Sequence, residues 1–329
     1  MIKLLRLIVT CALVLAFFVV MLGAYTRLTD AGLGCPDWPG CYGRLVMPVK
    51  QIDMTHMQSQ YPHTPIESGK AWTEMAHRYV AGTLALLIVV IFCGVVYLRR
   101  QEAVCMPWIL PSILMLLVAF QAALGMWTVT LKLLPVVVMG HLLGGISIFT
   151  CLGYLWWQLS VVDRHHLPRS KFWINLGIVI VFCQIALGGW VSSNYAGIAC
   201  IGFPLCNGQW IPPLHFKEAF NIFSAIGENY QGGLLDNSVR ATIQVVHRLG
   251  AYFTATYLLI LSCFLLWRIK FKSIRAAAVV ILVLIVMQLL LGVINVLYLL
   301  PLWAAVAHNG LAALILFSLV SLRYLSGKR

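Results

Sequence analysis

Eight apolar runs, each long enough to cross a bilayer, dominate the sequence and restrict the folds open to it. They cover approximately residues 5–26, 72–98, 108–130, 136–159, 171–192, 239–267, 275–297 and 302–323. A helix of about 20 apolar residues spans the hydrocarbon of a membrane. Backbone groups in lipid must be hydrogen-bonded within the protein, and these runs are too long for barrel strands. The sequence therefore predicts an all-α polytopic membrane protein with eight transmembrane helices.

The distribution of charge agrees with a membrane protein and predicts its orientation. Only 10% of the residues are charged, whereas soluble domains average about 25%. The net charge of +13 suggests nucleic acid until the charges are mapped onto the chain. The basic residues gather in alternate connections between the runs, at Lys3, Arg6, Arg99, Arg100, Arg164, Arg169, Lys171, Arg268, Lys270, Lys272, Arg275, Arg323, Lys328 and Arg329. Such connections are cytoplasmic by the positive-inside rule, so we expect both termini in the cytoplasm and no nucleic-acid partner.

The two halves of the chain repeat each other. The interval from Leu22-Gly23 to Cys35 recurs from Leu187-Gly188 to Cys200, and each of these cysteines is followed by another at the same spacing, Cys41 and Cys206. A second set of four positions recurs with a shift of 167 residues: Gln121, Leu124, Gly125 and His141 match Gln288, Leu291, Gly292 and His308. We expect parallel repeats, residues 1–165 and 166–329, related by an axis along the membrane normal. They would form two pseudo-symmetric four-helix bundles.

Four histidines lie near the predicted outer ends of helices, in two matching pairs. His77 and His141 belong to the first half, and His247 and His308 to the second. We expect the paired helices to run antiparallel or nearly so, which would let their outer ends meet. Two imidazoles that face each other across a bundle can be the axial ligands of a haem iron. A lone membrane histidine often only bonds a neighbouring helix, and zinc sites take three or four protein ligands, so the repeated pairs favour haem.

Polar residues beside the histidines distinguish the two halves. Glu74 precedes His77 by three residues and shares its helix face, while the second half has Gln244 at the corresponding position. This difference suggests that proton chemistry is confined to the first pocket; the alternative is a solvated carboxylate. Arg78 and Arg248 directly follow His77 and His247. They could bind a haem propionate or reach toward lipid headgroups, and the sequence leaves both readings open.

Two cysteine pairs lie in the long outer loops, at about residues 27–71 and 193–238. We expect Cys35 to bond Cys41 and Cys200 to bond Cys206, because the outer compartment is oxidising. Each disulfide could staple its loop as a lid over a bundle. The first could instead exchange electrons, which would require a strained or exposed bond.

Taken together, these motifs resemble haem A synthase, a family shared by bacteria and mitochondria. The resemblance rests on Gly34-Cys35-Pro36-Asp37-Trp38-Pro39-Gly40-Cys41, Glu74-x-x-His77-Arg78, Gly140-His141, His247-Arg248 and His308-Asn309-Gly310, and it covers essentially the whole chain. It implies oxidation of the C8 methyl group of haem O to a formyl group, which makes haem A for terminal oxidases. It further implies that the first histidine pair receives haem O, that the second holds a resident haem b, and that Glu74 is the essential acid. The second loop departs from the pattern, because Ile201-Gly202-Phe203-Pro204-Leu205 lacks the acidic and aromatic residues of the first.

The resemblance also implies a location and partners. We expect a multi-pass protein of the bacterial cytoplasmic membrane with its cysteine loops on the outer face. It would receive haem O from haem O synthase, serve the machinery that assembles terminal oxidases, and pass electrons by way of haem b to an acceptor that the sequence does not identify. Glu74 would accept a proton or stabilise a cationic intermediate.

Two other functions compete with haem A synthesis. A two-haem electron carrier of the cytochrome b type explains four histidines but neither the difference between Glu74 and Gln244 nor the cysteine loops. A haem transporter or chaperone would also fit a repeated chain, but we see no broken helix at mid-membrane of the kind that transporters use.

Overall fold

The computed structural model describes residues 1–46, 58–62, 65–101, 108–223 and 225–327. Within these residues, eight helices are long and apolar enough to cross a membrane, which confirms the predicted fold class. They are α1 (Ile2–Leu28), α3 (Ser68–Arg100), α4 (Ile109–Thr130), α5 (Pro135–Gln158), α6 (Pro168–Ser193), α8 (Asn237–Arg268), α9 (Lys272–Leu297) and α10 (Leu302–Leu325). The short helix α7 (Phe216–Ala219) lies in the loop between α6 and α8.

The helix ends follow local chemistry. Helices α5 and α6 begin at Pro135 and Pro168, where the missing N–H would have had no partner within the helix. Helices α3, α8 and α10 carry arginine in the last turn, where a positive charge is favourable beside the carbonyl end of the helix dipole. The basic clusters that predict orientation therefore also mark where helices stop.

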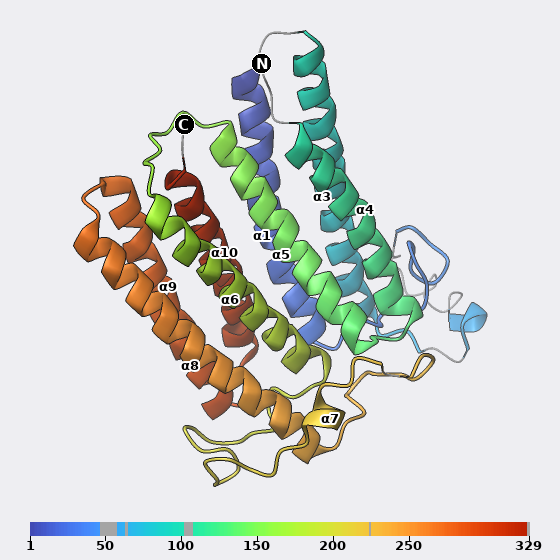
Figure 1. Cartoon of the computed structure of the whole chain (residues 1–329). Helices are drawn as coiled ribbons and strands as arrows, with labels where there is room; N and C mark the ends of the chain where they lie inside the picture. Colours follow the sequence, from blue (N-terminus) through green and yellow to red (C-terminus); the bar gives the residue numbers. More distant parts are fainter. Residues whose placement is uncertain (47–57, 63–64, 102–107, 224, 328–329) are drawn as a thin grey trace.

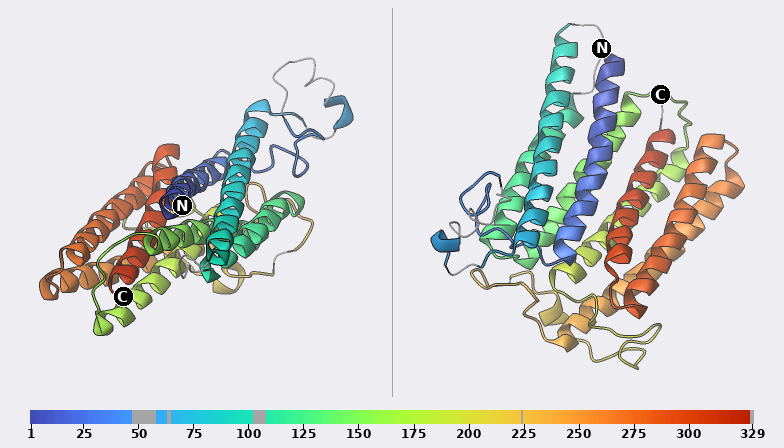
Figure 2. Two further views of the ribbon diagram at one scale, coloured as in Figure 1. Left: turned by 90° about the horizontal axis from the view of Figure 1, so that it is seen from above. Right: turned by 180° about the vertical axis from the view of Figure 1, so that it is seen from behind.

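Each half of the chain forms a ring of four helices. In the first half α1 and α4 each contact both α3 and α5, and in the second half α6 and α9 each contact both α8 and α10. Viewed along the helices, the two groups lie side by side (Figure 2). This arrangement agrees with the predicted pair of bundles. The two histidine-bearing helices of each ring, α3 with α5 and α8 with α10, are therefore diagonal to each other.

The histidine-bearing helices of each bundle are parallel, so the expectation that they run antiparallel was wrong. Helix α4 lies between α3 and α5 in the chain, and α9 lies between α8 and α10. The chain reverses direction twice between the two members of each pair, so both members run the same way (Figure 1). The histidines still lie at the same end of the bundle, because each one is near the start of its own helix.

A shared wall of α1, α5, α6 and α10 joins the two bundles. Three phenylalanines cross it in a row: Phe17 lies 5.7 Å from Phe149, and Phe149 lies 5.5 Å from Phe317, between ring centroids. Gly153 and Gly310 allow the helices to approach closely, because a Cβ at either position would collide with a side chain of the facing helix. Small residues serve this purpose widely in membranes, where packing replaces the hydrophobic effect as the force between helices.

Both ends of the chain lie at one end of the molecule, and the two long loops lie at the other (Figure 1). The short α4–α5 and α9–α10 turns are also at the loop end. Both turns place two consecutive residues in the left-handed region, Lys132 and Leu133 in one and Leu299 and Leu300 in the other. Residues other than glycine rarely adopt this conformation, so the repeat between the halves extends to unusual backbone geometry.

Candidate functional site

Each predicted histidine ligand lies against a glycine of the preceding membrane-spanning helix. A Cβ built on that glycine would stand within 3.1–3.3 Å of the Cε1 atom of the imidazole. The pairs are Gly23 with His77, Gly125 with His141, Gly188 with His247, and Gly292 with His308. These four glycines, each of which follows a leucine, thus have one role in common, which is to leave room for an imidazole inside the bundle.

The first histidine pair has a geometry that suits one iron. The ring centroids of His77 and His141 are 6.4 Å apart. A metal bound about 2 Å from a nitrogen of each ring requires a separation of this order. The rings come from diagonal helices, so they approach each other across the interior of the bundle.

Unsatisfied ring nitrogens indicate what the pockets can hold. The Nδ1 atoms of His77, His141 and His308 are buried and have no hydrogen-bond partner among the described residues, and buried polar atoms normally have one. The same part of the chain contains no group of three or more His, Cys, Asp and Glu residues that could hold a metal ion. Because a porphyrin supplies the remaining ligands itself, a haem needs only two histidines. The residues present therefore fit a haem in each bundle.

Three glutamines contact the predicted ligands, and the sequence analysis missed one of them. Gln121 Nε2 donates to the backbone carbonyl of His141 at 2.6 Å. Gln184 Nε2 lies 3.1 Å from His247 Nδ1 and donates to the His247 carbonyl at 3.0 Å. Gln288 Nε2 lies 3.3 Å from His308 Nε2. The signal for Gln184 is the pattern Gln-x-x-Leu-Gly, which occurs at 121–125, 184–188 and 288–292.

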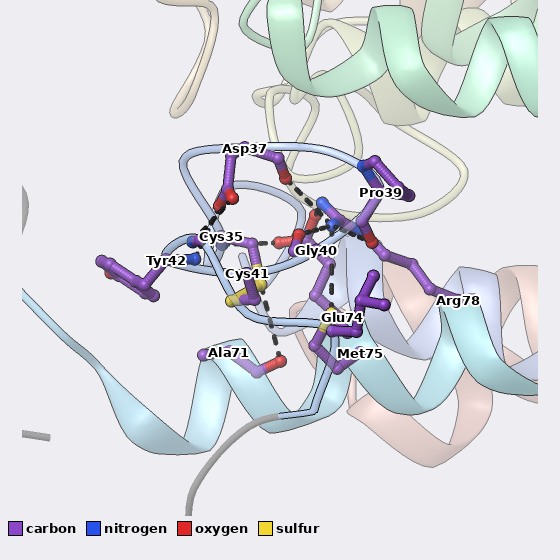
Figure 3. The surroundings of a disulfide bond; sticks show 12 residues. Cys35, Asp37, Pro39, Gly40, Cys41, Tyr42, Ala71, Glu74, Met75 and Arg78 are labelled. Atoms are coloured by element: carbon purple, nitrogen blue, oxygen red, sulfur yellow. Dashed lines mark hydrogen bonds and ion pairs between the residues drawn. A yellow bond between two sulfur atoms is a disulfide. The ribbon is translucent and has the colours of Figure 1, made fainter. Parts of the chain in front are cut away.

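Glu74 is buried and paired. Only 5% of the residue is exposed to solvent. Oε1 lies 2.5 Å from Arg78 Nη2, and Oε2 accepts a hydrogen bond from the backbone N–H of Cys35 at 2.9 Å (Figure 3). The carboxylate therefore joins helix α3 to the first cysteine loop. Gln244 is equally buried in the second half, but its Oε1 has no partner within the described residues.

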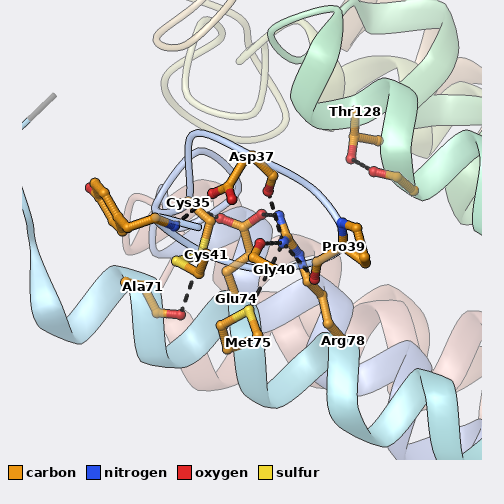
Figure 4. A network of polar contacts seen from close by, with 12 residues as sticks. Cys35, Asp37, Pro39, Gly40, Cys41, Ala71, Glu74, Met75, Arg78 and Thr128 are labelled. Atoms are coloured by element: carbon orange, nitrogen blue, oxygen red, sulfur yellow. Dashed lines mark hydrogen bonds and ion pairs between the residues drawn. A yellow bond between two sulfur atoms is a disulfide. The ribbon is translucent and has the colours of Figure 1, made fainter. Parts of the chain in front are cut away.

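Both arginines hold the cysteine loops. Arg78 Nη1 donates to the carbonyls of Asp37 at 2.9 Å, Pro39 at 3.2 Å and Gly40 (Figure 4). Arg248 plays the same part in the second half, where it donates to Leu205 O at 3.1 Å and Cys200 O at 2.6 Å. From the sequence, a haem propionate or lipid headgroups are the expected partners of these arginines, and not the loop carbonyls. A bond from these arginines to a haem propionate stays a prediction.

Both expected disulfides are formed, Cys35–Cys41 and Cys200–Cys206. The second cysteine of each pair also makes an isolated backbone bridge three residues on, with Arg44 and with Gln209.

Different side chains support the two loops. The Asp37 carboxylate accepts the N–H groups of Tyr42 at 2.6 Å and Gly43 at 2.8 Å. In the second loop the Asn207 side chain accepts the N–H of Ile201 at 3.0 Å. Burial, and then the negative charges of Glu67, Glu74 and Asp37, raise the pKa of the Tyr42 hydroxyl, so this ring stays neutral in the folded loop. The loops therefore share a shape without sharing a sequence.

A polar network links the two halves at the loop end. The Arg27 guanidinium lies over the ring of Tyr195, 3.8 Å from its centroid, and donates to Ser192 O at 2.6 Å. The Tyr195 hydroxyl donates to Asp30 Oδ1 at 2.9 Å, and Asp30 in turn lies 3.5 Å from Arg27. Each half thus contributes to one cluster beside the two pockets.

This architecture defines a class: a multi-pass membrane protein with two histidine pairs suited to haem, each pair having a disulfide-bonded loop held by the arginine beside one of its histidines. Comparison with known proteins gives the particular family. A family model described as "Cytochrome oxidase assembly protein" matches residues 6–320, and the chain belongs to this family.

Curated relatives extend the match. A protein of Shewanella oneidensis named "Heme A synthase" is 44% identical over 318 residues, which cover 95% of this chain and 93% of the relative. Proteins with the same name from Nitrosospira multiformis and Wolbachia pipientis wMel are 30% and 28% identical, over 95% and 90% of this chain and 89% and 85% of their own lengths. The resemblance that the motifs indicate is confirmed.

Proposed function

We propose that the protein is a haem A synthase, a membrane oxidoreductase that converts the C8 methyl group of haem O to the formyl group of haem A. One observation carries the assignment: at the same buried position the first pocket has the ionisable Glu74 carboxylate and the second has the Gln244 amide. A protein that only relays electrons has no need of an ionisable group in one pocket. The relatives named "Heme A synthase" support the same activity.

The two halves would divide the work. Residues 1–165 form the substrate half, in which His77 and His141 hold the iron of haem O. Residues 166–329 form the cofactor half, in which His247 and His308 hold a resident haem b. The support is the imidazole geometry of the first pair and the glycine clearance that both pairs have in common.

The side chains around the substrate pocket have distinct roles in this proposal. Removal of electrons from a methyl group releases protons, and Glu74 would accept one; the support is a buried carboxylate where the second half has an amide. Arg78 orients the carboxylate through the 2.5 Å ion pair, and it holds the first loop through three carbonyls. A closed loop excludes water, which strengthens the electrostatic interactions beneath it. When bound in the second half, haem b supplies an iron that can exchange single electrons.

The setting follows from the distribution of basic residues. We infer that both termini are cytoplasmic and that the cysteine loops face the outer side of the bacterial cytoplasmic membrane. The substrate is delivered by haem O synthase, and the product goes to the machinery that assembles terminal oxidases. An electron acceptor of unknown identity completes the reaction.

Analysis of bound pigments tests the proposal. The protein is purified in detergent from cells that make haem O, and its haems are extracted, separated and identified by mass. We expect haem b together with haem O and haem A. Haem b alone would instead indicate the electron carrier, and unmodified haem O without haem A would indicate a transporter or chaperone.

A further inference from the structure

A four-fold pattern surrounds the histidines. The helices α1, α4, α6 and α9 each present a Leu-Gly pair whose glycine lies against an imidazole. The residue four positions before that glycine lies one turn away on the same face of the helix. It is glutamine on three of the helices and Val19 on α1. Val19 is only partly buried and packs against the apolar core.

The glutamines contact the histidines, and the position of Val19 offers no such contact. Gln184 reaches both the ring and the carbonyl of His247. Gln121 bonds only the backbone carbonyl of His141, and Gln288 lies beside Nε2 of the His308 ring and not beside Nδ1. Within the described residues, the buried Nδ1 atoms of His77, His141 and His308 have no partner, and only the Nδ1 of His247 lies beside a glutamine.

The chemistry of ligation explains why such a contact matters. An imidazole that binds iron through Nε2 carries its proton on Nδ1, where an acceptor fixes the ring and raises its basicity. The amide oxygen and nitrogen of glutamine are interchangeable by a half-turn. After a half-turn, Gln184 would place its oxygen beside His247 Nδ1 and give up the bond that its nitrogen now donates to the His247 carbonyl. Valine cannot offer any acceptor.

We propose that Gln184 is a positioning residue that holds the His247 imidazole, and that Val19, at the equivalent position of α1, leaves His77 as an exchangeable ligand. This inference rests on the proposed function and deepens it. A resident haem needs a firmly held ligand, whereas a substrate haem must bind, react and leave. Loss of such a supporting partner typically weakens metal binding about 10- to 100-fold, which is enough to separate a permanent site from a transient one.

Three variants of the full-length protein test the inference: Gln184→Val, Gln184→Glu and the reciprocal Val19→Gln. Haem-loaded protein in detergent is mixed with excess apomyoglobin, and the transfer of each haem is followed by absorbance and pigment analysis. We expect haem b to leave Gln184→Val about 10- to 100-fold faster than wild type. Gln184→Glu keeps an oxygen acceptor, so it should retain haem b and lower its midpoint potential, because a carboxylate draws the Nδ1 proton more strongly. Val19→Gln should slow the departure of haem O and haem A.

Two outcomes would overturn the inference. Equal rates of haem b loss from Gln184→Val and Gln184→Glu would mean that Gln184 only fills space. Unchanged release from Val19→Gln would mean that His77 is not the exchangeable ligand, and this variant decides the matter even where Gln184→Val does not fold. Wild-type protein that contains haem b but neither haem O nor haem A would refute the proposed function instead, so the two failures are distinguishable.

Discussion

Replacing Glu74 with glutamine removes a charge from a buried site and keeps the shape of the side chain. The carboxylate makes two contacts, the ion pair with Arg78 at 2.5 Å and the bond from Cys35 N at 2.9 Å. Glutamine retains one acceptor oxygen, so about one charged hydrogen bond is lost, worth about 1.5–3 kcal/mol. Loop closure would weaken by about 10- to 100-fold, because 1.4 kcal/mol corresponds to a factor of ten. The second half already has a buried Gln244 at this position and still holds its loop through Arg248, so the variant should fold.

The chemical effect should exceed the effect on the loop. A missing proton acceptor costs about 10²- to 10⁴-fold in rate, so Glu74→Gln should bind haem O and form almost no haem A. The assay measures the ratio of haem A to haem O in the purified variant, with the rate of Cys35–Cys41 reduction by dithiothreitol as the measure of loop closure.

Arg78→Gln is the matched control for this experiment. It releases the loop but leaves the carboxylate in place, so we expect it to retain more conversion than Glu74→Gln. Normal haem A in Glu74→Gln would refute the role of Glu74 as the acid. Equal losses in the two variants, accompanied by equally fast reduction, would show that Glu74 acts only on the loop.

Three further predictions concern other parts of the molecule. Gly188→Leu should expel haem b, because a Cβ at this position already stands 3.2 Å from His247 Cε1. Gly82→Leu is the control, since a Cβ there has no atom within 4 Å. Equal pigment content in the two variants would contradict the prediction. Arg27→Leu should lower the free energy of unfolding in detergent by about 1.5–3 kcal/mol, since it breaks one charged hydrogen bond and a cation–π contact between the halves. An unchanged unfolding curve would argue against the network. Replacing both Cys200 and Cys206 with serine should speed proteolysis of the second loop, because a disulfide typically contributes about 2–4 kcal/mol of stability. Haem A should still be formed. A complete loss of haem A would show that this disulfide does more than staple the loop.

The fold was largely predictable from the sequence, because lipid permits few alternatives. Length and hydropathy identify helices such as α9 (Lys272–Leu297) without any tertiary information, and the repeat of His141 at His308 predicts a second bundle. The direction of the paired helices was also available from the chain, since a single helix separates α3 from α5. Helix α4 lies between α3 and α5, and α9 lies between α8 and α10, so each pair of histidine-bearing helices runs in the same direction.

The contacts of individual side chains were less predictable. Residue spacing places Glu74 and His77 on one helix face, but it does not say that the carboxylate turns toward Cys35 in a loop 39 residues earlier. Nor does it say that Arg78 donates to loop carbonyls, because the path of a loop depends on its own backbone bonds. Gln184 could have been found, since the Gln-x-x-Leu-Gly pattern is visible in the sequence. Its meaning required the position of His247 against Gly188.

The shared wall has a consequence for how the two sites communicate. His141 lies on α5 and His308 on α10, and these neighbouring helices meet through the ring contact of Phe149 and Phe317 at 5.5 Å. Each bundle therefore takes one imidazole from the wall and one from an outlying helix. Any displacement of α5 in one half would therefore be passed to α10 in the other through this packed contact, although the two sites have no ligand in common.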